Sequence, residues 1–438
     1  MLATQEAGNV TGQTTRIAAR PMRILYIDSK FGSPRASSHA RVYHFAQRLL
    51  ERGHEVTIIG RDSGRMELEG QRRRGMVTRG RLDGLEVVLL KVPYAQSFSK
   101  RMRMVSYGGF TLGAGLLAAT AGPADVVFAS SSPLTIGISG VLASRLRRTP
   151  FVFELQDLWP AVPIGMGFLT GRTEIKAAET LERSLYRAAR RIVVCSAEVR
   201  DVLVERGIPA RKIVLIPNVS DVEHFSPEIA DRSFRERHGL DGKLLAVYAG
   251  AMGVTNGIDQ LVDAAVALRE AGENGVAIVA AGNGTEKERI EQRVAELGLE
   301  NMIVLPDIPR DEIPLLVGAA DVTLTAFAPY PILQTNSPNK FFDSLAAGKP
   351  PIVNLDGWLH RLVEENHVGV YFPPGDGKAL ADTLTDLAGK PELVRELGRN
   401  ARALAEREFA RDLLADRLAD VLEDVVAGPS RTSSPARA

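Results

Sequence analysis

The chain has 438 residues and a mass of 47.4 kDa, which is too long for one compact core and predicts two or three domains. Apolar residues make up 45% and charged residues 24%, an ordinary globular mixture that excludes a wholly disordered or collagen-like chain. The single cysteine, Cys195, excludes a disulfide framework and a cysteine-rich zinc site, so a reducing cytosol is the simplest compartment.

The net charge of +1 conceals a strong asymmetry between the two halves of the chain. Residues 22–225 contain 30 Lys and Arg against 19 Asp and Glu, whereas residues 226–438 contain 22 against 33. The first half therefore carries +11 and the second −11, which indicates that the first half faces an anionic surface or substrate; unequal drift of two surface compositions is the alternative. No basic helix with interleaved aromatic residues occurs, so no nucleic-acid partner is expected.

Along the chain, a polar extension is followed by two series of alternating strands and helices. Residues 1–21 lack the apolar segment of a secretory signal, and we expect them to be disordered. Short β-rich runs with little alternation, typical of a parallel sheet covered on both faces, then alternate with helical stretches. The expected strands are 23–28, 55–60, 85–92, 124–130, 151–155, 191–196 and 212–217, then 244–250, 276–282, 302–306, 321–327, 350–354 and 368–372.

These two series predict an α/β fold with two doubly wound parallel-sheet (Rossmann-like) domains. The domains are expected at 22–225 and 244–405, joined by a polar linker at 226–243. A helix is expected over 406–427 and a disordered tail over 428–438. Since ligands of such sheets lie beyond the carboxyl ends of the strands, a cleft between the domains is the predicted site.

The uncharged segment 104–124 is long enough to cross a membrane, but its five glycines and one proline argue against spanning. The basic residues Lys100, Arg101 and Arg103 precede it. We therefore expect a helix that lies in the interface of an anionic membrane or, alternatively, a buried crossover helix of the first domain.

The segment 335–350, TNSPNKFFDSLAAGKP, predicts a helix that begins after a proline loop and stops at Gly348. The first turn of such a helix offers unpaired N–H groups and a positive dipole end, so a diphosphate could bind there. Lys340 adds a full charge, and Asp343 lies one turn along, where it could hold a diol such as a ribose. Alternatively, the dipole alone favours an Asp in the first turn.

Four segments of the second half together resemble the donor domain of family-four retaining glycosyltransferases of GT-B fold. They are SPNKFFDSLAAGKPPI, YAGAMGVTNGIDQLVDAA (248–265), AAGNGTEKERI (280–290) and NMIVLPDIPRDEIPLLVGAADVTL (301–324). The acceptor domain of the same family resembles GHEVTIIG (53–60), FELQDLWP (153–160), CSAEVRDVL (195–203) and KIVLIPNVSDVEHFSP (212–227). The resemblance covers roughly residues 22–400 in consistent order and is closest to bacterial polysaccharide and O-antigen amino-sugar transferases.

The resemblance implies transfer of a sugar, an N-acetylated or deoxy hexosamine, from a UDP-linked donor to a lipid-linked or glycan acceptor in cell-surface polysaccharide biosynthesis. It further implies retention of configuration, no cofactor and no metal, an acceptor-binding domain at 22–225, a donor-binding domain at 244–405, and a final helix that crosses back to the first domain. We expect a cytoplasmic protein, peripheral on the inner face of the membrane. The alternatives are a nucleotide-sugar epimerase of the same architecture and a non-catalytic GT-B scaffold.

The family motifs are matched unevenly in the donor domain. Thr335 stands where the family has a Glu that holds sugar hydroxyls, and the loop 250–257 lacks the family's Arg and Lys for the diphosphate. We therefore expect a sugar with fewer hydroxyls and a phosphate site built largely from backbone amides. The resemblance assigns donor binding to Gly250, Gly253, Asn256, Gly282, Gly284, Ile308, Thr335, Ser337, Asn339, Lys340 and Asp343.

In the first domain, many family members have a His followed by an Asp. The resemblance places Gln156 at the position of the His and Asp157 at the position of the Asp. Asp157, Lys340 and His39 are the expected catalytic residues; for Asp157 a helix cap is the alternative. Any further cation for the departing phosphate is expected from Arg35 or Arg41, which with Gln156 form the acceptor and phosphate loop. His44 and His54 are expected to be structural, and Asn218 to lie in the cleft or in an Asx turn.

Overall fold

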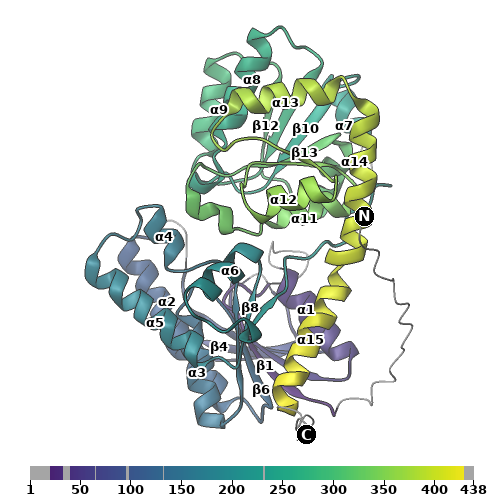
Figure 1. Cartoon of the computed structure of the whole chain (residues 1–438). Coiled ribbons are helices and arrows are strands. Elements are labelled where there is room, and N and C mark those ends of the chain that lie inside the picture. The colour runs from purple at the N-terminus through teal and green to yellow at the C-terminus, as the bar shows by residue number, and fades with distance from the viewer. Residues whose placement is uncertain are drawn as a thin grey trace, which may run out of the picture.

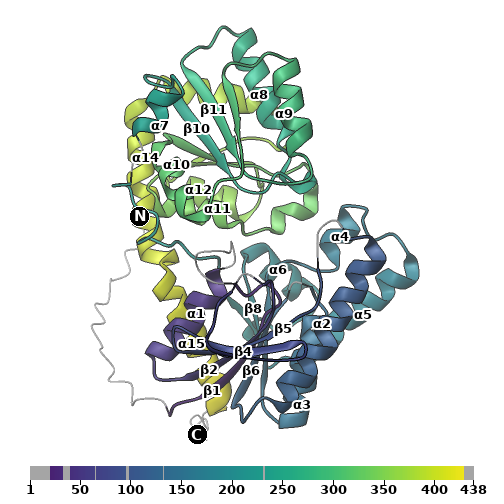
Figure 2. The same cartoon turned by 180° about the vertical axis from the view of Figure 1, so that it is seen from behind.

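The computed structural model describes residues 20–32, 40–64, 66–94, 98–131, 133–229 and 232–428, and it consists of two α/β units (Figures 1 and 2). The segments 1–21 and 428–438 lie outside the described residues except for Arg20, Pro21 and Gly428. The predicted α/β fold with two parallel-sheet domains is confirmed.

The first unit is built on a nine-stranded sheet in the order β3-β4-β5-β2-β1-β6-β7-β8-β9. All neighbours pair in parallel except β3 with β4 and β4 with β5, which are antiparallel. We did not predict this hairpin, because β3 reads EGQRRR and is exposed along its length, so it lacks an apolar signal. The strands are β1 (Arg23–Ile27), β2 (Glu55–Arg61), β3 (Glu69–Arg74), β4 (Val77–Leu82), β5 (Leu85–Leu90), β6 (Val126–Ser130), β7 (Phe151–Leu155), β8 (Arg191–Val194) and β9 (Ile213–Leu215).

Helices cover both faces of this sheet, as the apolar strands require. On one face Leu25, Val127 and Phe153 pack beneath α2, α3 and α5, while on the other Tyr26 and Phe128 pack beneath α1 and α15. The helices of the first unit are α1 (Ala40–Glu51), α2 (Lys100–Thr120), α3 (Ile136–Arg147), α4 (Ala161–Gly165), α5 (Arg172–Ala188) and α6 (Ala197–Glu205).

The second unit contains a six-stranded parallel sheet in the order β12-β11-β10-β13-β14-β15. The strands are β10 (Leu244–Ala249), β11 (Val276–Ala281), β12 (Met302–Leu305), β13 (Val322–Thr325), β14 (Pro351–Val353) and β15 (Val370–Tyr371). The helices are α7 (Arg232–Arg237), α8 (Asp259–Glu270), α9 (Lys287–Glu296), α10 (Ile313–Ala319), α11 (Asn339–Ala346), α12 (Trp358–Glu365), α13 (Gly377–Ala388) and α14 (Pro391–Leu404).

The segment 226–243, which we expected to be a linker, is in part built into the second unit. It contains α7, and Phe234 and Leu240 are buried in one of that unit's cores beside Leu245 and Val247. The polar sequence concealed these two apolar anchors, so the linker prediction is too long at its carboxyl end.

The chain returns to the first unit through a π-helical turn (Ala405–Phe409) and α15 (Arg411–Ala427), which packs along α1 (Figure 1). Leu414, Leu418 and Leu422 are buried in this contact. Arg52 at the end of α1 forms ion pairs with Asp416, Asp420 and Glu423 of α15, at 3.4, 2.9 and 2.7 Å. The helix therefore ties the two units together by apolar and ionic contacts.

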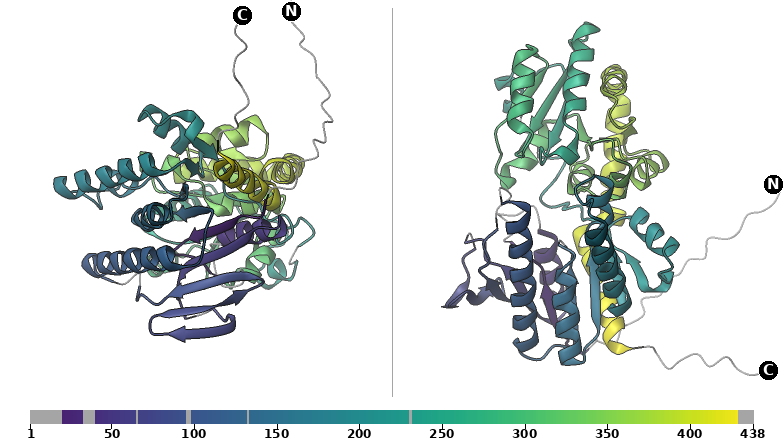
Figure 3. Two further views of the ribbon diagram at one scale, coloured as in Figure 1. Left: turned by 90° about the horizontal axis from the view of Figure 1, so that it is seen from below. Right: turned by 90° about the vertical axis from the view of Figure 1, so that its left-hand side faces the viewer.

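Helix α2 has features of both alternatives for segment 104–124, the helix in a membrane interface and the buried crossover helix. Phe110, Ala114 and Ala118 are buried against the sheet and α3, while Leu112 and Leu116 are 66% and 64% exposed. Figure 3 shows α2, in blue, on the outer surface of the first unit. Within the described parts of the chain, no helix has the length and apolarity needed to cross a membrane.

Candidate active site

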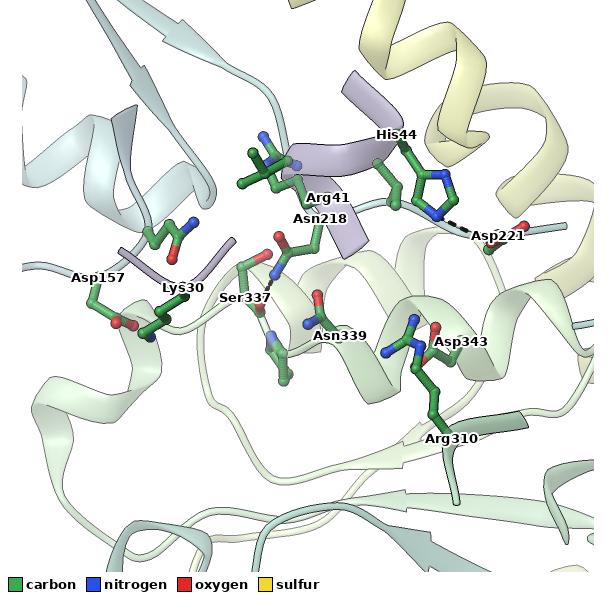
Figure 4. Close-up of a pocket in the computed structure, with 14 residues that line it drawn as sticks. Lys30, Arg41, His44, Asp157, Asn218, Asp221, Arg310, Ser337, Asn339 and Asp343 are labelled. Atoms are coloured by element: carbon green, nitrogen blue, oxygen red, sulfur yellow. Dashed lines mark hydrogen bonds and ion pairs between the residues drawn. The ribbon is translucent and has the colours of Figure 1, made fainter. Parts of the chain in front are cut away.

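A cleft of about 210 Å³ lies between the two units (Figure 4). The first unit contributes loops at the carboxyl ends of β1, β7 and β9 and the start of α1, and the second contributes α11 and a 3-10 turn (Arg310–Glu312). The lining residues are Lys30, Arg41, Val42, His44, Gln156, Asp157, Asn218, Val219, Asp221, Arg310, Ser337, Pro338, Asn339 and Asp343.

The start of α11 faces this cleft. Pro338 precedes the helix in an extended conformation (φ −77°, ψ 133°), and no side chain caps the first turn. Ser337 is 9% exposed, and its hydroxyl has no partner among the described residues. Its carbonyl accepts a hydrogen bond from Nδ2 of Asn218, which joins the two units at this point. A buried hydroxyl without a partner beside the positive end of a helix is an arrangement suited to an anion.

Lys340 lies in the first turn of α11 but points away from the cleft lining. Its Nζ donates to the hydroxyl of Tyr248 at 2.6 Å and lies 3.8 Å from the centre of that ring. Desolvation lowers the pKa of Lys340 to about 7. A Cβ at Gly250 would lie 3.2 Å from Nζ, so the lysine joins α11 to the loop after β10.

Asp343 lines the cleft one turn further along α11. Desolvation raises its pKa to about 7, and the charge of Arg310 opposes this shift (Figure 4). His44, which we expected to be structural, also lines the cleft, 3.7 Å from Asp221. Desolvation lowers the pKa of His44 to about 4, so it is neutral at physiological pH.

The glycine loops of the second unit lie beside the cleft lining and pack against each other. A Cβ at Gly282 would meet the carbonyl oxygen of Gly250 at 1.9 Å, and one at Gly284 would meet that of Met252 at 2.3 Å. These glycines are required for close backbone packing, whatever ligand the loops contact.

Three further donor-site predictions fall on side chains with local partners. Oδ1 of Asn256 accepts from the Gly253 amide at 3.2 Å, and the Thr335 hydroxyl donates to the Ile332 carbonyl at 2.8 Å. Ile308 packs against the core beside β10. None of the three lines the cleft, so the structure gives Asn256 and Thr335 a role in shaping their own loops.

The structure requires a correction for Arg41. It is 8% exposed; its Nε donates to Glu154 at 3.0 Å, and its two terminal nitrogens donate to the carbonyls of Pro217 and Ile216. Each guanidinium nitrogen therefore already has a partner within the first unit. Because α1 packs its apolar side on the sheet, Arg41 is buried with it. Its hydrogen bonds join the ends of β7 and β9.

The other residues predicted in the first unit divide into two groups. Gln156 donates to Ser130 at 2.8 Å, and Ser130 donates to Glu154 at 2.6 Å, so Gln156 belongs to the network of Arg41. Asp157 is exposed at the edge of the cleft. Arg35 and His39 lie outside the described residues.

Sequence reasoning missed Lys30, Arg310 and Asp221 as cleft residues. Lys30 follows the first strand by three positions, and Arg310 lies in the DIPRDE loop where only Ile308 was singled out. The position of Lys30 beyond the carboxyl end of a parallel strand was the available signal. Across the described ranges, no group of three or more His, Cys, Asp or Glu residues could hold a metal ion.

Two family models match the chain in the order of its two units. Residues 38–219 match the model described as glycosyl transferase 4-like domain, and residues 231–404 match glycosyl transferases group 1. Together they span most of the chain, which belongs to the GT-B glycosyltransferases that join these two domains.

Curated relatives match part of the chain at low identity. Alpha-D-kanosaminyltransferase of Streptomyces kanamyceticus is 21% identical over 243 residues, which cover 55% of this chain and 61% of the relative. WcaI of Escherichia coli (strain K12), named for colanic acid biosynthesis, is 25% identical over 244 residues, which cover 51% and 56%. The chain thus spans a little over half the length of these relatives.

Solved structures share the fold over almost the whole chain. Sucrose-phosphate synthase from Thermosynechococcus elongatus has a TM-score of 0.69 at 16% identity, covering 93% of this chain and 99% of its own. Anabaena HepE in complex with UDP-glucose has a TM-score of 0.66 at 18% identity, covering 92% and 99%. The predicted GT-B fold is therefore confirmed.

Replacing Arg41 by Met is expected to lower the free energy of unfolding by about 3–5 kcal/mol, because the Glu154 carboxylate stays buried without its partner. Urea unfolding of the full chain measures this loss. Arg79→Met, at an exposed position of the same unit, is the control and should change stability by less than about 0.5 kcal/mol. Unchanged stability of Arg41→Met would contradict the structural role.

Proposed function

We propose that the protein is a glycosyltransferase that transfers a sugar from a nucleoside-diphosphate donor to a lipid-linked or glycan acceptor in cell-surface polysaccharide biosynthesis. The observation that carries the proposal is the uncapped start of α11, with the buried Ser337 hydroxyl facing the interdomain cleft. Diphosphate oxygens would accept from this hydroxyl and from the first-turn amides. Asp343, one turn along, would accept from the ribose hydroxyls.

We propose a UDP-linked donor that carries an N-acetylated or deoxy hexosamine. HepE, which shares the fold, binds UDP-glucose, and the kanosaminyltransferase relative is named for an amino sugar. Thr335 has no carboxylate for sugar hydroxyls, and its own hydroxyl donates within its turn, which favours a sugar with fewer hydroxyls to hold.

Asp157 is the residue we propose to orient the acceptor hydroxyl, because it is exposed in the cleft on the first unit, opposite α11. A second cavity, of about 600 Å³, lies between α4, α5 and α6. Its walls include the apolar residues Pro160, Ala161, Ile164 and Ile208 and the charged residues Glu179, Glu182, Arg183 and Arg206. Since α4 follows Asp157 closely in the chain, the apolar part of this cavity supports an acceptor with an apolar portion.

We further propose that the first unit contacts an anionic membrane at its cytoplasmic face through α2. Met102, Val105, Leu112 and Leu116 are exposed on one side of this helix, and the basic residues at its start follow the cleft-side end of β5. An exposed apolar stripe beside positive charge is typical of helices that lie in a membrane interface.

The proposed reaction proceeds with retention and without a bound metal or cofactor. The helix start, the Ser337 hydroxyl and cationic side chains would stabilise the charge that develops on the departing diphosphate. Amides and cations can serve this role without a Lewis acid, and the family resemblance is the support for retention.

The first prediction concerns nucleotide binding. Thermal unfolding in the presence of UDP, GDP, ADP or dTDP should show a shift of several degrees with one base, since a ligand at a hundredfold its Kd stabilises by about 2.7 kcal/mol. Asp343→Ala should lose most of this shift. No shift with any of the four nucleotides would contradict the proposed function and favour a non-catalytic scaffold.

The second prediction concerns pH. Ribose binding needs ionised Asp343, and diphosphate binding is favoured by protonated Lys340, so with both pKa values near 7 the affinity for UDP should fall on either side of neutrality. Asp343→Asn should keep only the fall at high pH, and Lys340→Met only the fall at low pH. Arg310 and Asp221 face Asp343, and Tyr248 faces Lys340; burial raises the pKa of Tyr248 well above its ordinary value.

Isothermal titration calorimetry with UDP from about pH 5.5 to about pH 8.5 tests this profile. Each variant is compared with the wild type at the same pH, which cancels the titration of UDP itself. Identical profiles for all three proteins would show that neither charge affects nucleotide binding.

The third prediction concerns the membrane. Replacing Lys100, Arg101 and Arg103 by Gln should reduce the fraction bound to phosphatidylserine-containing vesicles about tenfold or more, since each basic residue near such a surface contributes about 1 kcal/mol. The matched control replaces Arg72, Arg73 and Arg74, three exposed basic residues of β3 in the same unit. Equal losses of vesicle binding in the two triple variants would contradict a specific role of α2.

A further inference from the structure

We propose that Lys30, on the loop after β1 of the first unit, supplies the cation that binds the donor diphosphate and stabilises it as a leaving group. This inference rests on the proposed function and adds to it a residue of the opposite domain. The phosphate site would then be completed only when both units face the same ligand.

The charge requirement follows from the ligand. A nucleoside-diphosphate sugar carries about two negative charges, whereas a helix start offers the equivalent of about half a positive charge. In the second unit, the loop 250–257 contains no cationic residue. The Nζ of Lys340 donates to the hydroxyl of Tyr248 at 2.6 Å. Because the pKa of Lys340 is about 7, this side chain is neutral in a large fraction of the molecules at physiological pH. A further cation is required for tight binding of the diphosphate.

The cations that line the cleft within the described ranges are Lys30, Arg41 and Arg310, since His44 is neutral. Arg41 is 8% exposed, and each of its three guanidinium nitrogens already donates within the first unit. Arg310 lies beside Asp343, one turn beyond the helix start, where a ribose would bind. Lys30 lies at the other end of the site with Asp157, near Ser337 and the start of α11 (Figure 4). Its side chain is exposed, and its charge acts on the buried carboxylate of Asp28.

The backbone of Lys30 is held in place, while its side chain is exposed. Its amide donates to Oδ1 of Asp28 at 2.6 Å, and Asp28 is 3% exposed at the carboxyl end of β1. This Asx-type contact fixes where the chain leaves the sheet. The side chain therefore starts from a rigid position at the sheet edge and extends into the cleft.

The ammonium of Lys30 would act in the step that transfers the sugar. The acceptor oxygen forms a bond to the anomeric carbon while the bond from that carbon to the phosphate oxygen breaks, its electron pair remaining on the phosphate. The acceptor hydroxyl proton passes to the departing phosphate oxygen. Lys30 keeps its own proton throughout and stabilises the negative charge that builds up on the diphosphate.

The test compares UDP with uridine, which lacks both phosphates, by calorimetry on the full chain. Lys30→Met should weaken UDP binding about tenfold to a hundredfold and leave uridine binding unchanged, because only UDP presents the anion. Lys30→Arg should retain most of the UDP affinity. Lys91→Met, which removes an exposed lysine of the same unit that is not among the residues lining the cleft, is the control for net charge.

Three outcomes would overturn the assignment. Wild-type affinity of Lys30→Met for UDP would exclude a contact with the donor diphosphate. Equal losses for UDP and uridine would indicate a structural role. Loss of binding to farnesyl diphosphate with UDP binding intact would assign Lys30 to the acceptor. If the wild type binds no nucleotide, both the assignment of Lys30 and the proposed function are wrong. The other three results contradict only the assignment of Lys30.

Discussion

Buried polar groups in a folded protein are normally paired, and the start of α11 departs from that constraint. Pro338 sets the direction of the chain into the helix, and among the described residues no side chain caps the first turn and none pairs with the enclosed Ser337 hydroxyl. The Ser337 carbonyl is meanwhile held by Asn218 of the other unit. The helix start is thus held at the domain boundary with its donors directed at the cleft, and each proposed role depends on this placement.

The opposite wall of the cleft is kept rigid by a buried ionic network. Arg41 and Glu154 join the end of β7 to the residues that follow β9, and Ser130 and Gln156 extend this network to the loop that carries Asp157. Such a network adds little net stability compared with apolar packing, but losing one member is costly. The consequence here is geometric, because the network holds in place the loop that carries the exposed Asp157.

Apolar strand patterns predicted the two parallel sheets, and the SPNKFFD segment predicted the helix at the site, because both signals are local in the sequence. Long-range pairing escaped prediction. Arg41 looked like a free phosphate ligand, yet its partners lie 113 and more positions away. Phe234 and Leu240 were hidden in a polar stretch, and β3 is exposed along its length, so it has no apolar side to reveal its hairpin with β4. Lys30 was overlooked because its place in the cleft opposite α11 is visible only in three dimensions.

The most direct test of the account is a crystal structure of the protein with UDP. The account predicts the diphosphate within hydrogen-bond distance of the Ser337 hydroxyl and the first-turn amides of α11, with the ribose hydroxyls on Asp343. Electron density for UDP elsewhere, for example in the cavity between α4, α5 and α6, would contradict the assignment of the donor site.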